Sequence, residues 1–175
     1  MDFGFPAMLV LLLLAADRDF LLLTLSVCIL HECGHGLAMC LTGAGLREIR
    51  LTAAGLQLRT GTSVLSKGKL LCIYLSGPLT NLVFAAIFCK LSTEIALLHL
   101  ALGLFNLLPF RVLDGGAALE TLQNPEPIRL WLCAGIWVVM LFALVLHSSR
   151  NPLLYLMLLY LAVSEWMHKK LPTVP

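Results

Sequence analysis

Long apolar runs, broken by short polar stretches, make up most of this chain. A helix needs roughly 20 apolar residues to cross a membrane. Five runs approach that length, namely 20–42, 69–89, 94–109, 129–147 and 152–167. A sixth run, 6–16, is shorter and would cross only with help from its neighbours, or halfway. The pattern predicts an all-α polytopic membrane protein with about six transmembrane helices, in a single domain over residues 1–175.

Residues 46–60, LREIRLTAAGLQLRT, have a different period. Ile49 and Leu51 alternate with Arg50, and Leu56 and Leu58 alternate with Gln57, as they would in strands with two unlike faces. One interpretation is a small membrane-associated β-hairpin. The other is a solvated basic loop, and the sequence leaves both open.

Composition identifies lipid as the solvent of this chain. Hydrophobic residues make up 59% and charged residues only 13%, where a soluble domain carries about 25% charge. The mean hydropathy is +0.92. We therefore expect contact with membrane lipid and no nucleic-acid partner. The six cysteines form no C-x-x-C pair and are expected to be free thiols.

The basic residues are distributed unequally between the two sides of such a bundle. One side would hold nine of them: Arg47, Arg50, Arg59, Lys67, Lys69, Arg111, Arg129, Lys169 and Lys170. The other side would hold Arg18, Lys90 and Arg150. Cytoplasmic loops carry the excess of Lys and Arg, so both termini are predicted to be cytoplasmic. The N-terminus changes side if 6–16 does not cross.

The first candidate catalytic motif is LHECGH, residues 30–35, inside the run 20–42. His31 and His35 are four residues apart, so on a helix both imidazoles lie on one face and can bind one zinc ion. Glu32 points elsewhere and can reach a water at the metal, as the base of an H-E-x-x-H metalloprotease does. Ionisable groups inside a membrane are usually functional rather than mere packing. Cys28 shares the histidine face, as a further ligand or as core packing.

A catalytic zinc commonly has three protein ligands, and Asp114 is the outstanding candidate for the third. Pro109 is expected to end the fourth helix. Gly115 and Gly116 would let the backbone turn sharply after Asp114, which predicts irregular backbone at membrane depth. Alone, the segment could equally be an Asp-Gly turn at the bilayer surface.

Two amides could assist the reaction. Asn81 follows Gly77-Pro78, which is expected to kink its helix, and Asn106 precedes Pro109. Either amide could donate to a developing oxyanion. Either could instead make a polar bond between helices.

HECGH, SGPLTN and NLLPFRVLDGG together resemble the site-2 protease family of intramembrane metalloproteases, and within it the stage IV sporulation protein FB branch of spore-forming bacteria. The matching motifs span 31–116. The resemblance implies zinc held by His31, His35 and Asp114, with Glu32 activating water and Asn81 near the site. It implies a bacterial cell-membrane protease acting on membrane-associated proteins, and in the sporulation branch on a sigma-factor precursor.

The chain departs from that family pattern in a few places. Val112 stands where many relatives have proline, and Ala117 where an arginine often follows the glycines. Relatives often carry a PDZ or CBS domain, and neither is expected within 1–175. Regulation would then come from partner membrane proteins or from substrate supply.

Three other functions remain open from the sequence. A membrane metal carrier could use the same His and Asp residues without needing Glu32. A haem protein could use His99 and His147, although both are better explained as packed or interfacial. A non-catalytic scaffold is disfavoured because all four proposed zinc-site residues are present.

Overall fold

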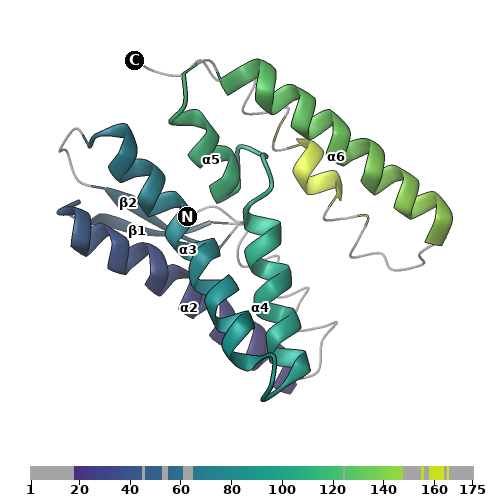
Figure 1. Ribbon diagram of the computed structural model, residues 1–175, viewed down its shortest axis with the longest axis horizontal. Helices are drawn as coiled ribbons and strands as arrows, with labels where there is room; N and C mark the ends of the chain where they lie inside the picture. Colours follow the sequence, from purple (N-terminus) through teal and green to yellow (C-terminus); the bar gives the residue numbers. More distant parts are fainter. Residues whose placement is uncertain are drawn as a thin grey trace. The chain divides into compact units, whose positions relative to one another are not determined.

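A computed structural model describes residues 18–44, 46–52, 55–60, 65–123 and 125–147, together with 155, 158–163 and 165. The predicted first segment, 6–16, lies outside these residues. The chain divides into two compact units, Met1–Leu107 and Leu108–Pro175. The ordered elements of each are labelled in Figure 1.

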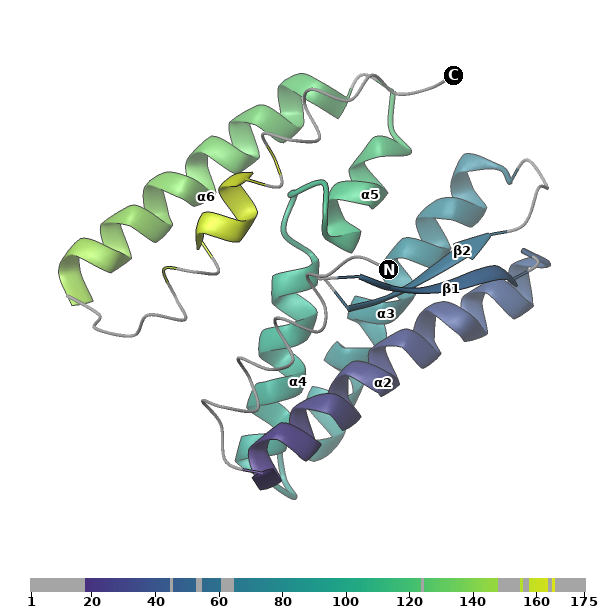
Figure 2. The same cartoon turned by 180° about the vertical axis from the view of Figure 1, so that it is seen from behind.

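The first unit contains three helices, α2 (Arg18–Thr42), α3 (Lys67–Phe88) and α4 (Thr93–Asn106). Helix α3 packs against both α2 and α4, as Figures 1 and 2 show from opposite sides. Ser66 and Ser92 cap α3 and α4, because their hydroxyls accept hydrogen bonds from the backbone N–H three residues on.

Glycines let these helices approach closely. A Cβ added at Gly34 of α2 would collide with the side chain of Thr80 and lie 2.8 Å from the carbonyl oxygen of Ser76. A Cβ at Gly103 of α4 would lie 3.2 Å from the carbonyl oxygen of Pro78. Small residues at helix contacts are typical of packing in membranes, where dispersion and polar bonds replace the hydrophobic effect.

This unit buries several polar side chains beside its apolar core and exposes large apolar ones. His31, His35, Asn81 and His99 are all at most 8% exposed. Large apolar side chains face outward instead, such as Ile29, Leu37 and Leu41 at 62–79% exposure. Soluble proteins rarely expose apolar surface on this scale. The outer faces therefore suit a lipid environment, and the interior suits a polar site.

Two of the described helices, α2 and α3, are long and apolar enough to cross a membrane. Helix α4 is apolar but has 14 residues, or about 21 Å at 1.5 Å per residue. Helix α4 begins one residue before the predicted segment 94–109. It ends at Asn106, three residues before Pro109. The residue before a proline is pushed out of the helical region, and here the helix ends still earlier. The count of about six spans stays a prediction.

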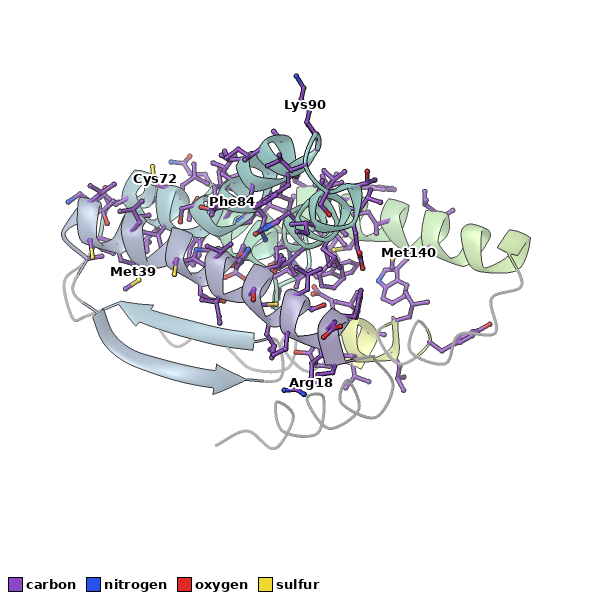
Figure 3. The ribbon with its side chains drawn as sticks, turned by 90° about the horizontal axis from the view of Figure 1, so that it is seen from below. Arg18, Met39, Cys72, Phe84, Lys90 and Met140 are labelled. Carbon is purple, nitrogen blue, oxygen red and sulfur yellow. The ribbon has the colours of Figure 1, made fainter. Side chains whose placement is uncertain are left out.

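An antiparallel strand pair occupies the segment 46–60. Strands β1 (Leu46–Thr52) and β2 (Gly55–Thr60) pair in a register that includes Ile49 with Leu58 and Leu51 with Leu56. A register shift between Leu46 and Glu48 marks one irregularity. The pair runs beside α2, as Figure 3 shows. Its association with a membrane surface stays a prediction.

The second unit contains α5 (Asp114–Glu120) and α6 (Pro125–His147). The expectation of irregular backbone at Asp114 was wrong, because Asp114 is the first residue of a helix and Gly115 and Gly116 lie in its first turn. A Cβ at Gly116 would collide with the backbone of Phe110. The second glycine therefore permits close packing of the preceding loop, rather than a turn.

Ion pairs hold that loop in place. Arg129 of α6 is 2% exposed and pairs with Glu126 at 2.7 Å and with Glu165. Arg111 also pairs with Glu126, and its backbone N–H donates to Glu165 at 3.1 Å. The hydrogen bond from Arg129 holds the pKa of Glu126 below its usual range, with the charge of Arg111 helping. The chain just before Asp114 is thus anchored within its own unit.

Candidate metal centre

His31 and His35 lie one turn apart on α2, and both are buried. Their Nε2 atoms are 3.2 Å apart, and the rings meet edge to face. Two nitrogens bound to one tetrahedral zinc at 2.0–2.1 Å would be about 3.3 Å apart. The two imidazoles therefore already have the separation that a shared zinc ion requires.

The ring of His35 has a defined tautomer. Its Nδ1 lies 2.7 Å from the carbonyl oxygen of Ile73 on α3. A carbonyl can only accept, so Nδ1 carries the hydrogen and Nε2 keeps its lone pair. The hydroxyl of Ser76 donates to the same carbonyl at 2.6 Å and lies 3.4 Å from Nδ1. Such a contact to the second ring nitrogen is what orients a metal-binding histidine.

His31 is held by Asn81 of α3. The amide nitrogen of Asn81 lies 2.9 Å from His31 Nδ1, and its amide oxygen lies 3.1 Å from His99 Nδ1 on α4. Asn81 is completely buried. Both ends of the amide are engaged behind the His31 ring, which favours a positioning role. Donation by Asn81 to an oxyanion stays a prediction.

Gly77 makes room for the pair. A Cβ at this position of α3 would lie 2.7 Å from His35 Cε1 and 2.8 Å from His31 Nε2, and it would collide with His35 Nε2. Helix α3 runs from Lys67 to Phe88 with Pro78 inside it. From the sequence, Gly77 and Pro78 were expected to kink this helix. The steric role of Gly77 was not predicted, because the contact is with another helix.

Glu32 lies on the same helix and is partly buried. Cys28 is partly buried as well, and it joins no metal-ligand group among the residues that the structure describes. A packing role for Cys28 stays a prediction.

The remaining candidates lie around the end of α4 and the start of α5. Asn106 donates from its amide to the carbonyl of Leu102 in its own helix at 3.0 Å. Pro109 is buried, and its carbonyl accepts from the thiol of Cys133 at 3.4 Å. Asp114 is partly buried and Gly115 is buried. Asp114 belongs to the second unit, so its combination with the histidines forms part of the proposal below.

The similarity of this chain to known proteins lies in its fold. No protein-family model matches the sequence, and no curated protein sequence matches it. The solved structure of the site-2 protease from Methanocaldococcus jannaschii is similar, with 22% sequence identity and a TM-score of 0.68. The match covers 99% of this chain and 91% of that one. The chain has the fold of that site-2 protease.

Proposed function

We propose that this protein is an intramembrane zinc metalloprotease that cleaves membrane-associated or transmembrane proteins. The observation that carries the proposal is the buried His31–His35 pair, with Nε2 atoms 3.2 Å apart and Glu32 beside them, among helices whose outer faces are apolar. The fold shared with a solved site-2 protease supports the same conclusion.

His31, His35 and Asp114 are the proposed zinc ligands. The donor set fits the metal, because two imidazoles and one carboxylate are typical of catalytic zinc. The tautomer of His35 also fits, since its Nε2 keeps a lone pair. Asp114 stands at the start of α5, where the helix dipole favours a carboxylate. When bound, zinc would polarise the scissile carbonyl and lower the pKa of a water ligand toward about 7.

Glu32 is the proposed general base. It follows a ligand directly in the sequence, but its side chain leaves the helix about 100° away from that of His31. It would take a proton from the attacking water and deliver one to the leaving amine. The proposed site must admit water, so we propose a polar path to it from the cytoplasmic side.

A helical substrate must be unwound before its peptide bonds can be attacked. The β1–β2 pair is two-stranded, and each of its strands has only one partner among the described residues. An extended substrate segment could add to one of these edges by backbone hydrogen bonds. The resemblance to the sporulation branch makes a sigma-factor precursor the first substrate to test, in a bacterial membrane with cytoplasmic termini and with regulation by membrane partners.

Reconstituted protein tests the activity. In lipid vesicles that contain a panel of single-pass proteins, we expect cleavage within or next to a transmembrane segment. A strong chelator should stop this cleavage, and added zinc should restore it. The reason is that Glu32, the proposed base, acts on a water that needs zinc for its activation. Mass spectrometry of the fragments provides the measurement. Zinc binding without cleavage, together with metal uptake into the vesicles, would support a carrier instead.

A further inference from the structure

A line of polar contacts runs from α4 through α3 to the histidine pair. His99 Nδ1 is 3.1 Å from Asn81 Oδ1, and Asn81 Nδ2 is 2.9 Å from His31 Nδ1. His31 Nε2 is 3.2 Å from His35 Nε2, and His35 Nδ1 is 2.7 Å from the Ile73 carbonyl. His99 begins the line, is 1% exposed, and was not predicted to belong to the site.

The hydrogens along this line can be assigned from its end. The Ile73 carbonyl only accepts, so His35 carries its hydrogen on Nδ1 and offers a lone pair at Nε2. Asn81 presents its amide N–H to His31 Nδ1, so the hydrogen of a neutral His31 is on Nε2 and points to His35. Asn81 Oδ1 accepts, so His99 carries its hydrogen on Nδ1. Each of the four contacts named above then has one donor and one acceptor.

Metal binding requires a different arrangement at His31. A ligand nitrogen must present a lone pair, so the hydrogen of His31 has to leave Nε2 and reside on Nδ1. Asn81 must then face His31 with its oxygen, which a half-turn of the amide achieves. That turn points the amide N–H at His99, whose hydrogen moves from Nδ1 to Nε2. Each imidazole keeps one hydrogen throughout, so no proton is gained or lost.

We propose that His99 is a positioning residue of the metal site, which acts through Asn81 to let His31 adopt its metal-binding tautomer. The inference rests on the proposed zinc site. A neutral imidazole nitrogen can donate or accept according to its tautomer. His99 therefore satisfies Asn81 in both orientations of the amide. An apolar residue would leave one end of a completely buried amide without a partner, which is costly.

The packing of His99 is suited to this role. Its ring lies parallel to those of Phe84 and Phe88 on α3, with centroids 5.3 and 6.0 Å away. The stacking packs the imidazole against α3, and the hydrogen bond to Asn81 directs its Nδ1.

Zinc affinity of the full-length chain in detergent tests the inference, by competition with a chelator of known affinity. His99→Phe keeps an aromatic ring but removes both nitrogens. We expect it to bind zinc about 10–100-fold more weakly, as when the Asn81 contact to the ligand His31 is itself lost. His99→Gln can present either N–H or oxygen to Asn81 and should bind nearly as wild type does. Circular dichroism checks that each variant is folded, and His99→Leu replaces His99→Phe if the larger ring is not accommodated.

Phe84→Leu is the matched control, because it removes ring packing on His99 and leaves its nitrogens in place. The inference predicts wild-type zinc affinity for this control. Equal affinity in wild type and His99→Phe, or an equal loss in Phe84→Leu and His99→Phe, would overturn it while leaving the zinc site intact. Absence of zinc from the wild type would overturn the proposed function itself, and this inference with it.

Discussion

Glu32→Gln should lower peptide hydrolysis by about 10²–10⁴-fold, the usual contribution of a general base, while zinc stays bound. The substitution preserves the size and the hydrogen-bonding capacity of the side chain but removes its ability to accept a proton at neutral pH. Glu32 is not a proposed ligand, so the metal should be unaffected. Cleavage rate and zinc content are measured on the same vesicle preparation.

Cys33→Ser is the matched control for this prediction. Cys33 is the next residue on α2 and is exposed, away from the histidine pair. The Cys33→Ser variant should cleave the substrate at the wild-type rate. Undiminished cleavage in Glu32→Gln would exclude Glu32 as the base, whereas loss of zinc along with activity would mean that Glu32 supports the metal site instead.

Gly77→Ala should remove most of the bound zinc without unfolding the helices. The added methyl would overlap both imidazoles at the Nε2 atoms that are proposed to bind zinc, so the rings must rotate away or α3 must move. Zinc sites tolerate little departure from tetrahedral geometry at 2.0–2.1 Å. Metal analysis after dialysis measures the loss, and circular dichroism measures the helix content.

Gly68→Ala is the control on the same helix, because an added Cβ at Gly68 meets nothing within 4 Å. It should retain zinc as the wild type does. Full zinc content in Gly77→Ala would show that the histidines are not held against α3 as the structure describes.

The sequence was informative wherever function depends on local spacing. His31 and His35 were placed on one helical face because four residues make about one turn, and they do lie together. The strand alternation in 46–60 is also a local pattern, and a strand pair lies there. Asn81 was linked to the site through its motif, and it contacts His31.

Roles that depend on packing between helices could not be predicted. His99 is 18 residues from Asn81 in sequence and on another helix, so nothing in the local pattern joins them. Gly77 and Gly116 were interpreted through backbone freedom, whereas the structure uses their missing side chains for close contact. The helical start at Asp114 was missed because its N-cap, Leu113, makes no side-chain capping hydrogen bond that the sequence could signal.

Zinc content of the purified wild type and of Asp114→Ala is the most direct test of the proposed three-ligand site. We predict one zinc per chain in the wild type and a marked loss in Asp114→Ala, because two histidines alone leave a catalytic zinc one protein ligand short. A wild type without zinc, or an Asp114→Ala variant that keeps it fully, would contradict the proposed combination of His31, His35 and Asp114.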